Sequence, residues 1–147
     1  MTRSQRMLPV QKLAEERANA AAKAYAEARD RSAAQRQRLE QLAAFREDYL
    51  NQRTASGSAG MDGFRLRDYN AFLARIDAAI RHQQEVIRQV EADTERLRLV
   101  WMEQLGRARA MDKVVERYRQ EEQRADERRG QRQTDELALR RRGPDLE

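Results

Sequence analysis

Apolar residues recur at every seventh position on two interleaved tracks between Leu66 and Tyr118, without a slip in phase. The first track reads Leu66, Leu73, Ile80, Ile87, Thr94, Trp101, Ala108 and Val115. The second track reads Tyr69, Ile76, Gln83, Val90, Leu97, Gln104, Met111 and Tyr118. Two such tracks give a mean spacing of about 3.5 residues, which is the repeat of a left-handed coiled-coil seam. The pattern predicts a long helix that buries one narrow stripe.

A weaker seam with the same step runs through the first third of the chain, and a glycine-rich and serine-rich segment separates the two seams. The early seam is predicted at Val10, Leu13, Arg17, Ala21, Ala24 and Ala28, and it becomes bulky from Leu39 to Tyr49. Two long helices joined by a short turn pack antiparallel. We therefore predict an all-α fold, a long two-helix antiparallel coiled-coil hairpin in a single elongated domain, 1–147. Its predicted segments are helix one at 7–54, a turn at 55–63, helix two at 64–133 and a frayed, flexible charged tail at 134–147.

The composition limits what else the chain can form. Of its 147 residues, 37% are charged and 5% are aromatic, which leaves too little apolar material for a broad core. The chain has no cysteine, which excludes disulfides and thiolate ligands, and its net charge of +5 is carried mostly by arginine. Arginine favours pairing with carboxylates, so acidic partner surfaces are expected. No stretch is apolar enough to span a bilayer, and we expect a cytoplasmic protein.

The residues that most catalytic sites need are missing or isolated. His82 is the only histidine, and no phosphate-binding loop or nucleophile elbow is present. The carboxylates near Glu122 are numerous, but nothing on an exposed two-helix rod would desolvate them. We therefore expect no enzyme activity, no cofactor, no metal and no small-molecule substrate. The arginine-rich tail lacks interleaved aromatic residues, so no specific nucleic acid is expected, and a DNA-binding basic hairpin is kept only as an alternative.

An aromatic and apolar group brackets the turn. It comprises Leu42, Phe45 and Tyr49 on helix one and Tyr69, Phe72, Leu73, Ile76 and Ala79 on helix two. Antiparallel pairing places both sets at the same end of the hairpin, and Phe72 lies one step off the seam. Two interpretations remain open: a core at the hairpin end, or an exposed docking patch.

The order and spacing of several elements resemble the FliJ family of bacterial flagellar export proteins. These elements are the string from Leu39 to Tyr49, the glycine-bearing turn, Tyr69-Asn-Ala-Phe-Leu73, Ile76, Ala79-Ile80, Trp101 and Asp135-Glu136. The resemblance spans nearly the whole chain. It implies a noncatalytic stalk and adaptor of the flagellar type III export apparatus, which serves flagellum biogenesis and thereby motility and chemotaxis.

The resemblance also implies partners and a location. The partners would be the flagellar export ATPase hexamer, whose assembly family members promote, the cytoplasmic domain of the transmembrane export gate, and export chaperones. The protein would lie in the cytoplasm, peripheral to the inner face of the cell membrane at the flagellar base. Two alternatives stay open: the equivalent stalk of a virulence injectisome, and a generic self-associating coiled-coil scaffold.

Two sets of contact residues follow from the resemblance. The set carried over for the export gate is Arg38, Leu42, Phe45, Tyr49, Phe72, Ile76, Ala79 and Gln83. The set expected for the export ATPase is Leu13, Arg17, Val114, Arg117 and Arg124, near the two chain ends. Arg38 and Gln83 depart from the side chains that are commoner in the family.

Overall fold

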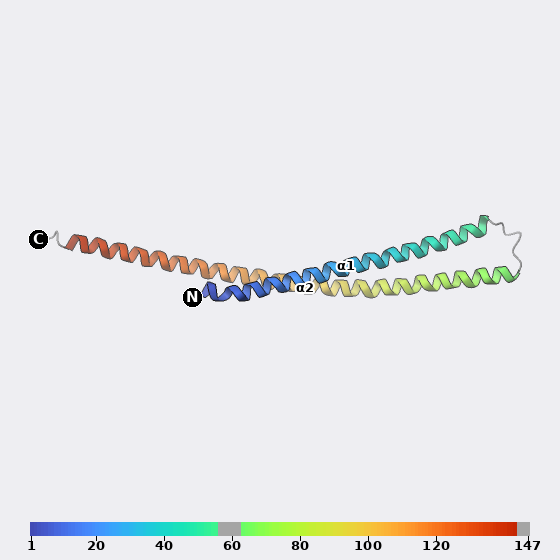
Figure 1. Cartoon of the computed structure of the whole chain (residues 1–147), viewed down its shortest axis with the longest axis horizontal. Coiled ribbons are helices and arrows are strands. Elements are labelled where there is room, and N and C mark those ends of the chain that lie inside the picture. Colours follow the sequence, from blue (N-terminus) through green and yellow to red (C-terminus); the bar gives the residue numbers. More distant parts are fainter. Residues whose placement is uncertain (56–62, 144–147) are drawn as a thin grey trace. The chain divides into compact units, whose positions relative to one another are not determined.

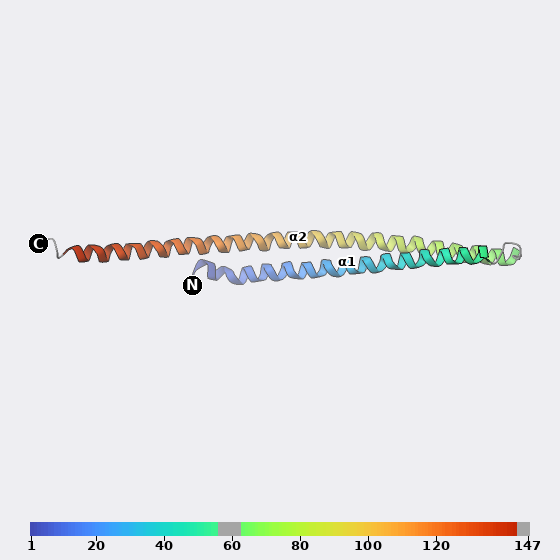
Figure 2. The ribbon, with the colours of Figure 1, turned by 90° about the horizontal axis from the view of Figure 1, so that it is seen from above.

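The computed structural model describes residues 1–55 and 63–143, which form two α-helices and no strand. Helix α1 spans Arg3–Ala55 and helix α2 spans Gly63–Arg142. The helices pack against each other in opposite directions (Figure 1, Figure 2). The predicted all-α helical hairpin is therefore confirmed. Most of the predicted turn, residues 56–62, and residues 144–147 of the predicted tail lie outside the described residues.

Helix α1 begins at Arg3, four residues before the predicted start at residue 7. A reciprocal capping box explains the difference: the Gln5 backbone N–H donates to the Thr2 hydroxyl at 3.3 Å, and the Thr2 N–H donates to the Gln5 side chain at 3.0 Å. Pro9, a residue type that is favoured in the first turn of a helix, lies inside α1.

Helix α2 also differs from the prediction, because it continues past residue 133 to Arg142. Every described residue from Asp126 to Gly143 is exposed. The segment carries short-range pairs along its own surface, among them Asp126–Arg129 at 2.7 Å and Gln131–Asp135 at 3.2 Å. Such pairs at spacings of three and four residues stabilise a helix locally. Residues 134–142, predicted as a flexible tail, are helical.

The chain divides into two compact units, each made from one stretch of α1 and one stretch of α2. The first unit comprises Met1–Ala20 and Met102–Glu147, and the second comprises Ala21–Trp101. The prediction of a single elongated domain stays a prediction. No helix among the described residues is long and apolar enough to cross a membrane.

The heptad seam of α2 is confirmed from Tyr69 to Tyr118, whereas Leu66, its first predicted residue, is 37% exposed. All buried residues of α2 in the described chain, Tyr69, Ile76, Gln83, Ala108 and Val115, lie on the two predicted tracks. The first half of the early α1 seam is wrong by one residue, since Val10, Leu13 and Arg17 are exposed while Ala14 is half-buried and Ala18 is buried. Its second half is confirmed, since Ala21 and Ala24 are half-buried and Ala28 is buried. Alanine lets two helix backbones approach closely, so the small side chains face α2 and the bulkier ones do not.

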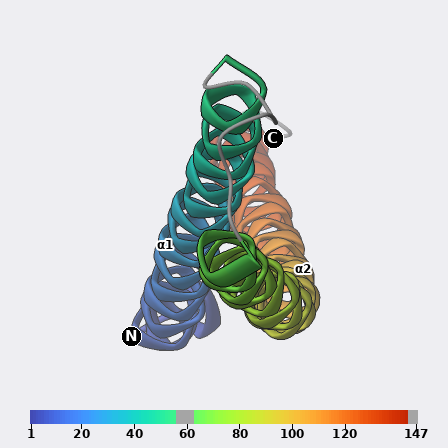
Figure 3. The ribbon, with the colours of Figure 1, turned by 90° about the vertical axis from the view of Figure 1, so that its right-hand side faces the viewer.

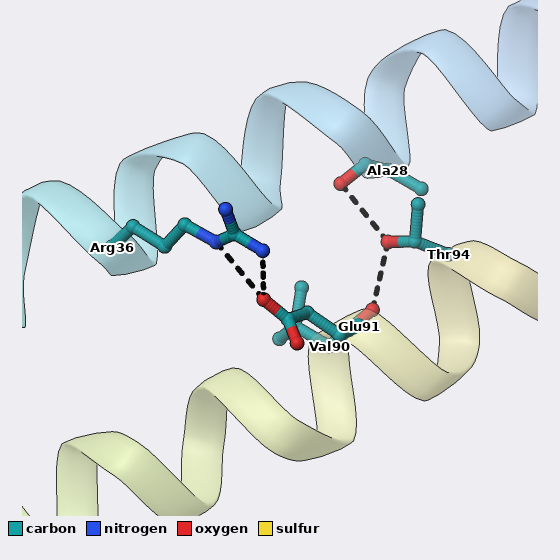
Figure 4. Close-up of polar contacts among 5 residues, drawn as sticks. All are labelled: Ala28, Arg36, Val90, Glu91 and Thr94. Atoms are coloured by element: carbon teal, nitrogen blue, oxygen red, sulfur yellow. Dashed lines mark hydrogen bonds and ion pairs between the residues drawn. The ribbon is translucent and has the colours of Figure 1, made fainter.

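Polar seam residues fix the register of the second unit. The Gln83 amide donates to the backbone oxygen of Gln35 at 2.9 Å and to its side-chain oxygen at 2.8 Å. The Thr94 hydroxyl lies 2.7 Å from the Val90 carbonyl oxygen and 3.3 Å from the Ala28 carbonyl oxygen (Figure 4). The Arg36 guanidinium pairs with Glu91 beside this contact. These bonds join specific α1 residues to specific α2 residues, as buried polar groups do in coiled coils.

Candidate partner-binding surfaces

The end of α1 and the start of α2 face the viewer in Figure 3. Four aromatic side chains of these two segments contact one another. We call Phe45, Tyr49, Tyr69 and Phe72 the aromatic cluster. The rings of Tyr49 and Tyr69 stack with centroids 4.8 Å apart, and Phe72 lies 4.6 Å from Tyr49 and 6.1 Å from Phe45. These distances lie within the range of favourable aromatic pairs. The cluster is therefore a continuous aromatic surface built from both helices.

The cluster is only partly covered. Tyr69 is buried and Tyr49 and Phe72 are half-buried, whereas Phe45 keeps 52% of its surface exposed. A hollow of about 470 Å³ lies against it, lined by Tyr49, Arg65, Asp68, Tyr69 and Phe72. The two interpretations of the group around the turn thus apply to different members. Tyr69 belongs to the seam, and Phe45 belongs to the surface.

The eight residues carried over for the export gate fall into three classes of exposure. Arg38, Phe45 and Ala79 are exposed, Leu42, Tyr49 and Phe72 are half-buried, and Ile76 and Gln83 are buried in the seam. Gln83 donates its amide hydrogens to Gln35 of α1. Ile76 and Gln83 therefore support the surface from below, while the exposed and half-buried members form it.

An interhelical ion pair stands next to the cluster. The Arg46 guanidinium donates to the Asp77 carboxylate at 2.6 Å, and both side chains are about one-third exposed, at 37% and 35%. The spacing of Asp77 and Arg81 in the sequence is typical of an acid-first pair along one helix. The structure instead pairs Asp77 with α1, a contact that depends on the antiparallel register.

The first unit carries an apolar groove of about 360 Å³. The groove lies between α1 and α2 and is lined by Val10, Leu13, Ala14, Arg17, Arg107, Ala110, Met111 and Val114. It exists because the α1 seam is shifted by one residue, which leaves Val10 and Leu13 outside the interhelical contact with 45% and 46% of their surfaces exposed. Arg17 adds positive charge to an otherwise apolar lining, and Arg107 lines the groove while it pairs with Glu103 at 2.7 Å.

The structure brings together three of the five residues expected for the export ATPase. Leu13, Arg17 and Val114 line the groove. Arg117 and Arg124 are exposed on α2 and do not line it. Sequence reasoning missed Val10 and Met111 as groove residues, because it placed both of them in the buried seam.

The Glu122 carboxylate of α2 binds the start of α1. The Glu122 side chain accepts a hydrogen bond from the Ser4 backbone N–H at 2.8 Å and another from the Ser4 hydroxyl at 2.6 Å. Ser4 is 5% exposed. The Ser4 hydroxyl and backbone N–H lower the pKa of Glu122 below its ordinary value of 4.5. A carboxylate at a helix N-terminus is also favoured by the helix dipole.

Because the folded state lowers this pKa, Glu122 stabilises the first unit above pH 4.5 and loses that contribution as the pH falls through the lowered value. We expect Glu122→Gln to lower the thermal unfolding midpoint at pH 7 and to lower it less at pH 3, because the contribution of the carboxylate falls with pH below 4.5. Circular dichroism at the two pH values measures this. Glu121→Gln, an exposed neighbour, is the control. Equal midpoints of natural and Glu122→Gln chains at pH 7 would contradict the assignment.

Within residues 1–55 and 63–143, no group of three or more histidine, cysteine, aspartate or glutamate side chains is arranged to hold a metal ion. His82 is exposed on α2. The features with the geometry of binding sites are thus the aromatic cluster of the second unit and the apolar groove of the first.

Comparisons with known proteins identify one family. No curated protein and no solved structure matches the chain significantly. The model of the family described as flagellar FliJ protein matches residues 3–143, which is nearly the whole chain. The chain therefore belongs to the flagellar FliJ family and is a component of the flagellar type III export apparatus.

Proposed function

We propose that this protein is a noncatalytic adaptor of flagellar export that binds the cytoplasmic domain of the transmembrane export gate through the aromatic cluster. The observation that carries the proposal is the exposure of Phe45 on a surface that also includes Tyr49 and Phe72. An aromatic side chain that packs on one side and stays open on the other is typical of a binding hot spot. The family match supports the flagellar system over an injectisome.

The groove of the first unit is the proposed contact with the export ATPase hexamer. Its apolar floor suits an apolar side chain, and Arg17 suits a nearby carboxylate. Through this contact the protein would promote assembly of the ATPase ring. We also propose that it escorts export chaperones and works in the cytoplasm at the inner face of the membrane, as the resemblance implies.

Phe45→Ala tests the gate contact. We expect the affinity for the purified cytoplasmic domain of the gate to fall at least tenfold, because the partner would lose an exposed aromatic anchor. The thermal unfolding midpoint should change little, since half of the Phe45 side chain contacts no protein atoms. Isothermal titration calorimetry and circular dichroism measure the two quantities.

Leu99→Ala is the matched control, because Leu99 is 55% exposed and lies on α2 away from the cluster. It should leave the affinity for the gate unchanged. If the natural chain does not bind the gate domain, or if Phe45→Ala binds as tightly as the natural chain, the proposed contact is wrong.

A further inference from the structure

In the first unit, the seam of α2 continues beyond the stretch that α1 covers. The two heptad tracks stay covered as far as Glu122 and Ala125, which are half-buried, and Glu122 binds Ser4 in the first turn of α1. Helix α2 runs on past the start of α1 (Figure 1), and every described residue from Asp126 to Gly143 is exposed. We call residues 126–142 the extension. The tracks keep their phase there, and their residues are Arg129, Arg132, Glu136 and Leu139.

Arginine side chains lie close together on this uncovered seam face. A hollow of about 290 Å³ is lined by Ala125, Arg128, Arg129 and Arg132. Arg128 has Arg124 four residues before it and Arg132 four residues after it, and like charges at that spacing destabilise a helix. Neither Arg128 nor Arg132 forms an ion pair within residues 1–55 and 63–143. An anionic partner would relieve the repulsion between these arginines.

The pair that Arg129 forms does not change this balance. Arg129 donates to Asp126 at 2.7 Å, and the two side chains are 71% and 73% exposed. An ion pair so open to water contributes little free energy, so Arg129 can exchange Asp126 for another carboxylate at small cost. All three arginines of the hollow are therefore available to a partner.

We infer that the seam face of the extension binds an acidic helix of a partner protein, which follows α1 as the second helix of the coil. The face continues the one that α1 covers, so a helical occupant fits its shape. Carboxylates of that helix would pair with Arg128 and Arg132, because an arginine fork binds a carboxylate through two hydrogen bonds. Leu139, which is 69% exposed, would contact an apolar residue of the same helix. The inference is independent of the proposed contacts with the gate and the ATPase.

The charges beside the arginines favour a protein helix over nucleic acid. Glu136 lies on the same tracks as Arg132, and a phosphate backbone would be repelled by it, whereas a partner helix can place a basic residue there. The sequence from Arg119 to Gly143 contains no aromatic residue on which a base could stack. A partner helix with carboxylates near the arginines therefore matches the face better.

A synthetic helical peptide of three heptads tests the inference with the full chain. Each heptad of the peptide has leucine at one seam position and glutamate at the other. We expect this glutamate peptide to bind the natural chain in a fluorescence anisotropy titration. A peptide with glutamine in place of glutamate should bind roughly tenfold more weakly or worse, because it cannot form charge-assisted hydrogen bonds with the arginines.

The double variant Arg128→Gln/Arg132→Gln tests the residues. It should bind the glutamate peptide roughly tenfold more weakly than the natural chain, since two hydrogen bonds between charged groups are lost. Its helical content in the absence of peptide should not fall, because the substitutions remove repulsion between like charges. Circular dichroism measures the helical content, so a loss of binding can be separated from a loss of helix.

The matched control is Arg109→Gln/Arg141→Gln. It removes the same charge from two exposed positions of α2 in the first unit that lie outside the heptad tracks. This control should bind the glutamate peptide as the natural chain does. The titration contains neither the gate domain nor the ATPase, so a failure of either proposed contact would leave its result unchanged.

Three results would overturn the inference. The first is absence of glutamate-peptide binding, or equal binding by the natural chain and Arg128→Gln/Arg132→Gln. The second is binding of a short DNA duplex that is tighter than binding of the peptide and is lost in the same variant, which would assign the face to nucleic acid. The third is a dimer of the natural chain in light scattering that this variant dissociates, which would assign the face to a second copy of the chain.

Discussion

Truncating Ile76 to alanine is expected to lower the free energy of unfolding by about 2–5 kcal/mol, the largest stability effect of a single substitution that we predict. Ile76 is 6% exposed and lies on the α2 seam. The substitution removes buried methyl groups and leaves a cavity, which the two rigid helices cannot close by moving together. Urea unfolding followed by circular dichroism measures the change.

The same experiment shows whether Ile76 packs in the interhelical seam or is available to contact the export gate. Leu99→Ala removes an aliphatic side chain of similar size that is 55% exposed, and it should change the free energy of unfolding by less than about 0.5 kcal/mol. If Ile76→Ala is as stable as Leu99→Ala, the side chain is not part of the core. Ile76 would then contact the export gate itself, and would not merely support the contact surface from within the seam.

Introducing a charge at Leu13 is expected to abolish the contact with the export ATPase. Leu13→Asp places a carboxylate in the apolar groove of the first unit, where a partner side chain would have to desolvate it. We expect the affinity for the ATPase to fall by about a hundredfold or more. Because Leu13 is 46% exposed in the free protein, the helical content and unfolding midpoint should change little.

Size-exclusion chromatography with light scattering, in the presence of nucleotide, measures both co-elution with the ATPase and formation of its ring. Leu99→Asp is the matched control, since it adds the same charge at an exposed leucine outside the groove. Ring formation promoted equally by the natural chain and by Leu13→Asp would show that the groove is not the ATPase contact. A stable homo-oligomer that does not bind the ATPase would favour the self-associating coiled-coil scaffold instead.

The sequence predicted helix α2 better than helix α1, for a physical reason. Bulky residues such as Ile76 and Val115 recur in α2 with a period that only one helix face satisfies, and both are buried. In early α1 the alanines lie on several faces, so hydrophobicity alone did not reveal that Ala18 faces inward and Leu13 outward. The choice depends on how closely two backbones approach, which is a property of the pair of helices.

The candidate surfaces were predicted in part. Antiparallel pairing was enough to bring Phe45, Tyr49 and Phe72 together from distant parts of the chain. The heptad track placed Gln83 in the seam, where it is buried, but the weaker pattern of α1 did not fix the rotation of that helix about its axis and so did not predict the exposure of Arg38. The Thr2 and Gln5 pattern of a capping box was present in the sequence, and it would have given the correct start of α1.

The register bonds of the second unit restrict how its two helices can move. A heptad repeat permits one helix to slide along the other by seven residues with its apolar contacts largely restored. Such a slide would take the Gln83 amide away from Gln35 and place it opposite Leu42 or Ala28, where its side chain would find no polar side chain to bind. Sliding by a heptad is thus penalised in this unit. A force applied to one of its helices is therefore carried by both helices together. This unit would transmit a rotation or a push without sliding of one helix along the other.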